Sequence, residues 1–178
     1  MKIDLGNYYI SELDTAKPEL FYALIEKNRP RLEDFFAGTV RKTRSLEETM
    51  AYCQTIAKLR KEKAYLPYTV SKPGKTDYIG FLDVKNIDLT IPKAELGYFI
   101  DAGFEGQGII SKALEPFIQY LISTYRFKKL LCRVGSENQG SIKVALNNGF
   151  TLEGTIRRDY ITTRNQLVDL NYYGRIFD

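Results

Sequence analysis

The chain has 178 residues, of which 44% are hydrophobic and 27% are charged. This length and composition predict one domain over residues 1–178, with a core that needs no disulfide or metal. Its net charge of +4 comes without a long run of Lys or Arg, which favours a small anionic ligand over direct nucleic-acid binding. No histidine is present, so His-based triads, His metal sites and a His general base are excluded. Cys53 and Cys132 lie too far apart for a metal or redox motif.

The first residues, MKIDLGNYYISELD, have no apolar h-region, so we expect no signal peptide. No stretch approaches the roughly 20 apolar residues that are needed to span a bilayer. The expected location is the reducing cytoplasm, without membrane association.

Hydrophobic spacing in the first third of the chain predicts a strand and then helices. The expected elements are a strand over 8–13, a helix over 16–28, a turn or short helix over 31–36, and a helix that follows residue 45 and runs to about 63. Tyr9 and Ile10 are candidates for the core side of the strand, and Pro30 is expected to interrupt the first helix. Ser45 and Glu48 form an S-x-x-E pattern, which is typical of a capping box.

After residue 64 the pattern changes to alternation, which predicts antiparallel strands that lead into a glycine-rich bend and a long helix. The strands are expected at 65–71, 78–86 and 94–101, and the helix has one apolar stripe over 109–122. A bend with Gly103, Gly106 and Gly108 before a helix gathers unpaired backbone N–H groups at the positive end of the helix dipole. It predicts an anion site, usually for phosphate, with a plain tight connection as the alternative.

The last third of the chain predicts a strand over 129–135, a short helix over 140–148, and two closing strands over 151–156 and 167–176. Gly149 follows two asparagines and is expected to end the short helix. Together the elements predict a single-domain α+β fold. Helices flank a mixed, mostly antiparallel sheet with one parallel step across the main helix.

The order of these elements and four local motifs resemble the GNAT superfamily of Gcn5-related N-acetyltransferases, along nearly the whole chain. The motifs are FEGQGI at 104–109, SENQGSIKVALNNGF at 136–150, TLEG at 151–154 and VDLNYYGRI at 168–176. They look most like the RimJ/RimL branch, which acetylates the N-terminal amine of ribosomal proteins and has relatives that act on other amines. The resemblance implies the GNAT fold and acetyl-CoA as co-substrate, and no metal is expected.

The acetyl-CoA motif of the family, Q/R-x-x-G-x-G/A, falls on residues 105–110, with Gly108 at its first glycine. Glu105 stands where the family has Gln or Arg, and Ile110 stands where it has a small residue. Because backbone N–H groups make most of the contacts to the diphosphate, such side-chain changes are tolerable. The Glu105 carboxylate is expected to point to solvent.

The resemblance also implies that the strand at 98–100 splays away from the strand at 130–134, and that the pantetheine arm of the coenzyme lies in this gap. Asn138 would contact that arm, cap the short helix, or do both. The residues expected to bind the coenzyme are Phe99, Ile100, Glu105, Gly106, Gln107, Gly108, Ile109, Ile110, Ser111, Asn138 and Ser141.

Acetyl transfer needs a neutral amine, and without histidine the base must be a carboxylate, a tyrosine, or water ordered by one of them. Glu95 occupies a strand position at which many GNAT enzymes carry a catalytic glutamate, and Asp159 matches the base of the ribosomal-protein branch. Glu95 could instead form a salt bridge, and Asp159 could pair with Arg157 or Arg158. For Asp159 a water relay is preferred, because the reference pKa of Asp is only about 3.9.

Ser141 matches the serine that serves as the acid in the ribosomal-protein branch, whereas Ala145 stands where many GNAT enzymes have a tyrosine. A serine is a poor free acid, so it would hydrogen-bond the thiolate sulfur and relay a proton. Its alternative role is an ordinary helix serine bonded to the backbone. A backbone N–H near Ile100 would stabilise the oxyanion.

The expected function is direct acetyl transfer from acetyl-CoA to a primary amine in a ternary complex. The alternative is a non-catalytic acyl-CoA-binding sensor or interaction module. A dinucleotide-binding oxidoreductase is disfavoured, because Ser111 stands at the third Rossmann glycine and antiparallel strands precede the bend. The acceptor could be a ribosomal protein N-terminus, a polyamine, an aminoglycoside or another small amine, and the protein a monomer or a homodimer.

Overall fold

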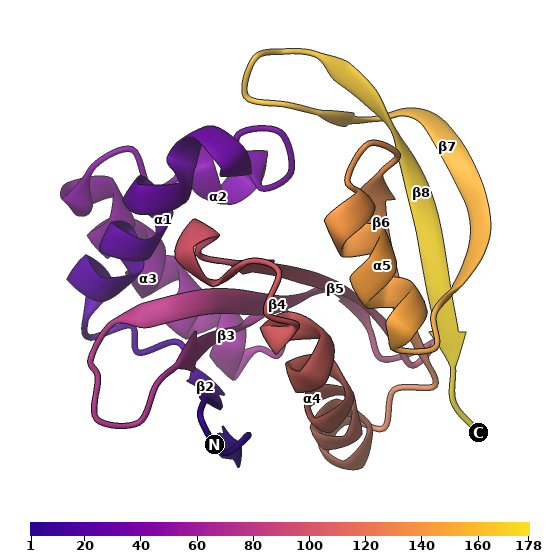
Figure 1. The fold of residues 1–178 in the computed structure, drawn as a ribbon, viewed down its shortest axis with the longest axis horizontal. Helices are drawn as coiled ribbons and strands as arrows, with labels where there is room; N and C mark the ends of the chain where they lie inside the picture. The colour runs from indigo at the N-terminus through magenta and orange to yellow at the C-terminus, as the bar shows by residue number, and fades with distance from the viewer.

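A computed structural model describes residues 1–178 and contains one eight-stranded sheet in the order β1-β2-β3-β4-β5-β6-β8-β7 (Figure 1). The strands are β1 Lys2–Asp4, β2 Tyr9–Glu12, β3 Leu66–Ser71, β4 Tyr78–Asp88, β5 Lys93–Ile100, β6 Lys129–Gly135, β7 Thr151–Ile161 and β8 Leu167–Ile176. Every neighbouring pair is antiparallel except β5 and β6, which are parallel. The predicted mixed sheet with a single parallel step is confirmed.

Five α-helices flank the sheet, and a short 3-10 helix follows β5. They are α1 Pro18–Leu32, α2 Ala37–Arg41, α3 Leu46–Lys61, η1 Ala102–Phe104, α4 Ile109–Tyr125 and α5 Gln139–Asn147. Side chains alternate along a strand, so Phe81 and Phe99 join the core beneath α1 to α3, whereas Leu82 and Tyr98 join the larger core against α4 and α5. The two groups of helices lie apart in Figure 1. None of the helices is long and apolar enough to cross a membrane.

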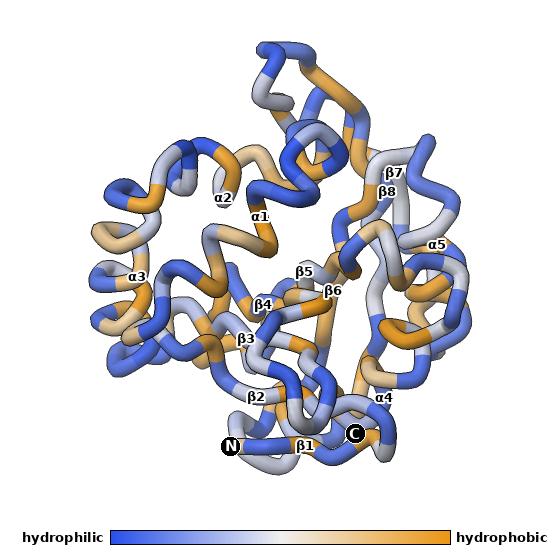
Figure 2. The backbone as a smooth tube through the Cα atoms, turned by 60° about the vertical axis from the view of Figure 1, so that its left-hand side comes forward, coloured by the Kyte–Doolittle hydropathy of each residue, from blue (hydrophilic) through white to orange (hydrophobic).

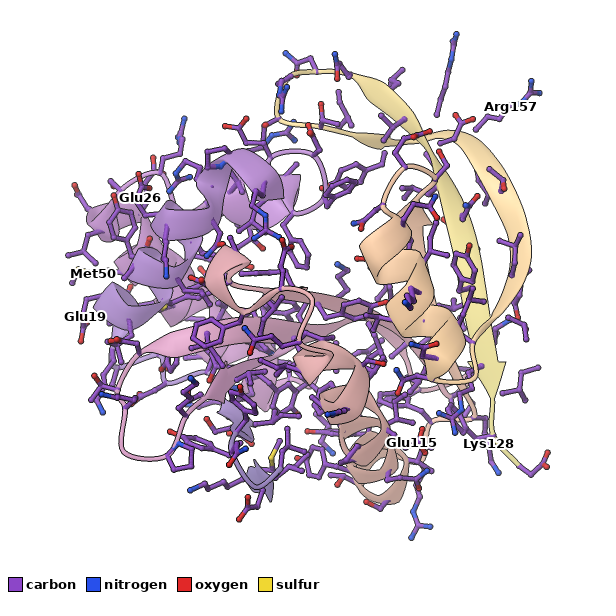
Figure 3. All side chains as sticks on the ribbon, in the orientation of Figure 1. Glu19, Glu26, Met50, Glu115, Lys128 and Arg157 are labelled. Atoms are coloured by element: carbon purple, nitrogen blue, oxygen red, sulfur yellow. The ribbon has the colours of Figure 1, made fainter.

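The start of α3 confirms the predicted cap. The Glu48 N–H donates to the Ser45 hydroxyl at 3.1 Å, but the Glu48 carboxylate accepts from the N–H of Arg44 and not from that of Ser45. Hydrophobic and hydrophilic residues alternate along α3 at the helical period (Figure 2). Outward-facing side chains of this layer, such as Glu19, Glu26 and Met50, project away from the sheet (Figure 3).

The expectation that Pro30 interrupts the first helix is wrong, because α1 continues to Leu32. Pro30 removes only the hydrogen bond to the carbonyl of Glu26, an exposed residue whose carbonyl water can satisfy. The buried side chains of Asn28 and Leu32 meanwhile hold the last turns against the core. The chain then turns over 33–35. Neither α2 nor β1 was predicted, since such short elements carry little periodicity.

The strand predicted over 151–156 is also too short, because β7 reaches Ile161. Its register with β8 shifts twice, between Leu152 and Gly154 and again between Ile156 and Tyr160. Such bulges break the alternation on which a sequence prediction depends. The β7–β8 hairpin arches above the rest of the molecule, with its tip toward α1 and α2 (Figure 1).

The sheet splits at its one parallel strand pair, β5 and β6. β5 and β6 pair only through Lys93–Lys129, Ala94–Leu130 and Glu95–Leu131, although both strands continue further. Beyond these pairs they diverge, as the resemblance implied, and leave an unpaired edge on each strand.

Candidate active site

A cleft of about 1160 Å³ opens where β5 and β6 diverge. One part, which we call the glycine arm, is lined by the end of β5, the bend before α4 and the β6–α5 connection, including Ile100, Gly108 and Ser141. The other part, which we call the charged arm, lies between α1–α2 and the middle of the sheet. It is lined by Phe36, Asp83, Lys85, Glu95, Arg133 and Tyr160. All of the predicted site residues line this cleft except Gln107 and Asp159.

The bend before α4 presents backbone N–H groups to the glycine arm. Gly106 and Gly108 have φ values of +72° and +69°, which residues with a Cβ adopt only with strain. Gly108 is the N-cap of α4 and no side chain caps this end, so the N–H groups of residues 109–111 have no partner in the helix. The space beside both glycines is open. An anionic group therefore fits here.

Side chains around the bend differ from the expectation. Glu105 is exposed, as expected, but its carboxylate forms an ion pair with Arg31 of α1. The Gln107 amide donates to the carbonyl of Gly103 at 3.3 Å, and Ile109 and Ile110 are buried in the core. Only the backbone of these last two residues is free to contact a ligand.

The end of β5 presents polar backbone groups to the gap. The Asp101 N–H donates to the Ile79 carbonyl of β4, so by the alternation of an antiparallel ladder the N–H and carbonyl of Ile100 face the other way, toward β6. The Ile100 carbonyl already accepts from Arg31 at 3.3 Å. Phe99 is placed differently, because its ring packs against Phe36 in the core at 5.1 Å between centroids.

The start of α5 forms the opposite wall of the glycine arm. The Ser141 N–H donates to the Asn138 side-chain oxygen at 3.1 Å, so Asn138 is the N-cap of this helix, as predicted. The Tyr98 hydroxyl donates to the Ser141 carbonyl at 2.9 Å and ties β5 to α5 across the gap. The Ser141 hydroxyl has no hydrogen-bond partner in the protein, so its alternative role as a backbone-bonded serine is not supported.

Arg133 of β6 joins both candidate bases in the charged arm. Its guanidinium donates to Glu95 at 2.8 Å and to Asp159 at 3.3 Å. Burial lowers the pKa of Arg133, but Glu95 and Tyr172 outweigh this effect and raise it, so the group stays a cation. The sequence pattern did not single out Arg133, although a cation within the apolar run LLCRV was a usable signal.

Glu95 and Asp159 differ in whether a carboxylate oxygen remains without a partner. Glu95 is 6% exposed; one oxygen accepts from Asn86 at 2.7 Å and from Arg133, and the other faces Lys85 at 3.5 Å. The salt bridge considered for Glu95 is therefore confirmed. Asp159 accepts from Tyr172 at 2.7 Å and from Arg133 through one oxygen only, and its side chain is 24% exposed.

The pairing considered for Asp159 with Arg157 or Arg158 is wrong. Arg157 points away from the molecule on the outer side of the hairpin (Figure 3), and the Arg158 N–H donates to Asp169. Burial and the hydrogen bond to Asp159 raise the pKa of Tyr172, so its hydroxyl remains a donor. The bulge in β7 turns Asp159 toward β6 and away from its neighbours in sequence.

Comparisons with known proteins agree with this geometry. A family model described as the acetyltransferase (GNAT) domain matches residues 11–151. The ribosomal-protein-serine acetyltransferase of Escherichia coli K12 is 33% identical over 57% of this chain, and the match spans only 56% of that relative. The putative ribosomal N-acetyltransferase YdaF of Bacillus subtilis 168 is 30% identical over 90% of this chain and 86% of its own length.

Solved structures have the same fold. RimL, a ribosomal L7/L12 alpha-N-protein acetyltransferase solved in complex with coenzyme A, superposes with a TM-score of 0.89 at 25% identity, over 100% of this chain and 99% of the other. The ribosomal-protein-S5-alanine acetyltransferase of Vibrio fischeri, at 17% identity, shows the fold alone, with a TM-score of 0.88 over 100% and 97% of the two chains. The chain therefore belongs to the GNAT family of acetyl-CoA-dependent N-acetyltransferases, in its RimJ/RimL-like branch.

Proposed function

We propose that this protein, with residues 1–178 acting as one catalytic domain, transfers the acetyl group of acetyl-CoA directly to the N-terminal amine of a protein. The observation that carries the proposal is the cleft at the parallel step, which joins an anion-binding bend to the Arg133 side chain, and Arg133 in turn binds Asp159, a carboxylate with one free oxygen. The names of the relatives favour a ribosomal protein as acceptor.

The glycine arm suits acetyl-CoA. The N–H groups at the start of α4 would hold the diphosphate, and the pantetheine would lie along β5 as an added strand where β5 and β6 diverge. Asn138 and Ser141 would border the thioester from the other side. We propose that the Ile100 N–H stabilises the oxyanion, since it has no partner in β4.

We propose Asp159 as the base. It keeps one oxygen free to order a water that takes the proton of the amine, whereas the oxygens of Glu95 are occupied by Asn86, Arg133 and Lys85. Glu95 then acts as a positioning residue for Arg133. The free hydroxyl of Ser141 would hydrogen-bond the departing thiolate and relay a proton to it.

The test uses the purified protein with acetyl-CoA and two peptides. One has a free N-terminus, and the other is N-terminally blocked and carries an internal lysine. We expect thiol release with the free N-terminus and none, or much less, with the blocked peptide. Binding of acetyl-CoA by calorimetry without thiol release for any amine would favour the non-catalytic acyl-CoA-binding module. No heat with acetyl-CoA would overturn the proposal altogether.

A further inference from the structure

One hydrogen bond crosses the gap where β5 and β6 have separated. The two strands stop pairing after Glu95 and Leu131, so residues 96–100 of β5 and residues 132–135 of β6 share no ladder. From this free part of β5, the Tyr98 hydroxyl donates to the Ser141 carbonyl of α5 at 2.9 Å. Apart from apolar packing, this contact is what fixes the distance between β5 and α5 at this level of the gap.

The Tyr98 side chain is itself held firmly. Strand alternation turns its ring to the face of α4 and α5, where it is 8% exposed and belongs to the same core as Cys132 and Ala145. Burial and the neighbouring Cys132 thiol raise the pKa of Tyr98, so its hydroxyl keeps its proton and remains a donor. Because protein interiors are close-packed, the buried ring holds this hydroxyl at a fixed height above the strand.

The first turn of α5 depends on contacts from outside the helix. The helix has nine residues, and a helix this short is marginal on its own. Its second residue is Gly140, which weakens a helix further. The Ser141 N–H donates to the Asn138 cap at 3.1 Å, and the Ser141 carbonyl accepts from Tyr98. Both polar groups of the Ser141 backbone are therefore fixed, one by the cap and one by β5.

The Ser141 hydroxyl, in contrast, is left free for a ligand. Ser141 lines the glycine arm, and its hydroxyl has no hydrogen-bond partner in the protein. A serine side chain has three staggered rotamers, and a rotamer points to a defined place in the cleft only if the backbone beneath it is fixed. A displacement of about 1 Å at a reacting group can cost about 10²-fold in rate. Contact with a departing thiolate therefore requires a firmly held first turn.

We propose that Tyr98 is a positioning residue for acetyl transfer: its hydroxyl holds α5 at a fixed distance from β5, so that the Ser141 hydroxyl meets the thioester sulfur. Tyr98 acts through Ser141 and not on the reacting atoms. The inference rests on the proposed acetyl transfer and on the proposed proton relay by Ser141. The proposed diphosphate site lies on another element, the start of α4, so loss of the Tyr98 contact should affect the reaction more than the binding of the coenzyme.

The experiment is a double-mutant cycle of Tyr98→Phe and Ser141→Ala. It measures the rate constant of acetyl transfer in a single turnover with saturating peptide, and the Kd and stoichiometry for acetyl-CoA by calorimetry. We expect Tyr98→Phe to lower the rate constant about 5- to 50-fold in the wild-type background. In the Ser141→Ala background, Tyr98→Phe should lower it less than about twofold, because no hydroxyl is left to position. The Kd for acetyl-CoA should change less than about threefold in all four proteins.

Tyr173→Phe is the matched control. Tyr173 of β8 is 5% exposed in the same core as Tyr98, and its hydroxyl makes no hydrogen bond, so the rate constant and the Kd should be those of the wild type. The calorimetric stoichiometry corrects each rate constant for inactive protein. A merely structural role of Tyr98 would lower the stoichiometry or the rate constant by the same factor in both backgrounds.

A wild-type rate constant in Tyr98→Phe, an equal loss in both backgrounds, or a loss that appears only as a weaker Kd would overturn the inference and leave acetyl transfer intact. If Ser141→Ala reacts at the wild-type rate, the proton relay by Ser141 is wrong and the inference fails with it, although the protein remains an acetyltransferase. A wild-type enzyme that acetylates no amine at all would overturn the proposed function first.

Discussion

Arg133 is the residue through which the charged arm is held together. It donates to Glu95 on β5 and to Asp159 on β7, and its guanidinium lies 5.9 Å from the Tyr172 ring. One guanidinium thus bridges the two carboxylates through charge-assisted hydrogen bonds. Arg133 therefore holds Asp159, which has one free carboxylate oxygen, close to the buried carboxylate of Glu95.

Replacement of Asp159 by Asn should separate catalysis from coenzyme binding. We expect kcat for a peptide N-terminus to fall by about 10²- to 10⁴-fold, since the amide cannot accept the proton, with the Kd for acetyl-CoA unchanged. Steady-state kinetics and calorimetry measure the two quantities. Asp169→Asn is the matched control, because Asp169 is exposed on the same hairpin and its Asn oxygen can still accept from the Arg158 N–H. An unchanged kcat in Asp159→Asn would show that Asp159 is not the base and would favour Glu95 in that role.

Arg31 is expected to offset the carboxylate that Glu105 places beside the anion-binding bend. Arg31→Ala should raise the Kd for acetyl-CoA about 3- to 10-fold, because an unpaired Glu105 then repels the diphosphate at a partly screened distance. In the Glu105→Gln background, Arg31→Ala should raise the Kd for acetyl-CoA less than twofold. Calorimetry on the four proteins of this double-mutant cycle gives the coupling. Equal effects of Arg31→Ala in both backgrounds would show that the pair does not act on the coenzyme.

At the scale of elements, one glycine leaves space for a buried carboxylate between β4 and β5. Gly97 of β5 lies opposite Asp83 of β4, and a Cβ there would collide with the Asp83 carboxylate and approach Lys85 Nζ to 3.1 Å. The Asp83 carboxylate thus occupies the space that a side chain at position 97 would need.

Gly97→Ala should therefore be strongly destabilising. We expect the free energy of unfolding to fall by about 1–3 kcal/mol, because the buried Asp83 carboxylate and the Lys85 ammonium must shift to make room. Gly154→Ala on β7 is the control, since no atom lies within 4 Å of its Cβ position and the expected change is within about 0.5 kcal/mol. Urea denaturation measures both variants. Equal losses would mean that strand propensity, and not the Asp83 contact, determines the result.

Helix α1 connects the two arms of the cleft through its last turns. Asn28, which is buried, donates to Asp101 at 3.2 Å and accepts from the Ala102 N–H at 3.0 Å. Arg31, one turn later, reaches Ile100 and Glu105. The helix that forms one wall of the charged arm is thus fastened to the end of β5 and to the bend of the glycine arm.

At the scale of the whole molecule, two groups in the core beneath α1 to α3, Cys53 and Tyr78, contribute to the response of stability to alkaline pH. Burial raises the pKa of the Cys53 thiol to about 11 and that of Tyr78 to about 12. Since both values lie above those of the unfolded chain, the folded state holds these protons longer. Their contribution to stability is complete below about pH 8.5 and is lost as the pH rises through 11 and 12.

We expect the free energy of unfolding to decrease from about pH 9 upward, with Cys53→Ala reducing the slope between pH 9 and 11. Urea denaturation at a series of pH values, with a reducing agent present, provides the measurement. If the Cys53→Ala variant has the wild-type slope, the thiol does not contribute to the alkaline loss.

Local signals in the sequence were sufficient to predict many of the helices, strands and turns of this protein. Periodicity and caps predicted α4, the start of α3, the bounds of β6 and β8, and the glycine bend, because each depends on neighbours within a few residues. The absence of histidine excluded a His base, and the order of the motifs led to the GNAT family. Only the tertiary structure decided that α1 passes through Pro30, that Arg133 joins Glu95 to Asp159, and that Lys85 faces Glu95. The first outcome depends on the packing of Asn28 and Leu32 against residues distant in sequence, and the other two depend on which charged side chains meet across the sheet. No local pattern in the sequence records such contacts.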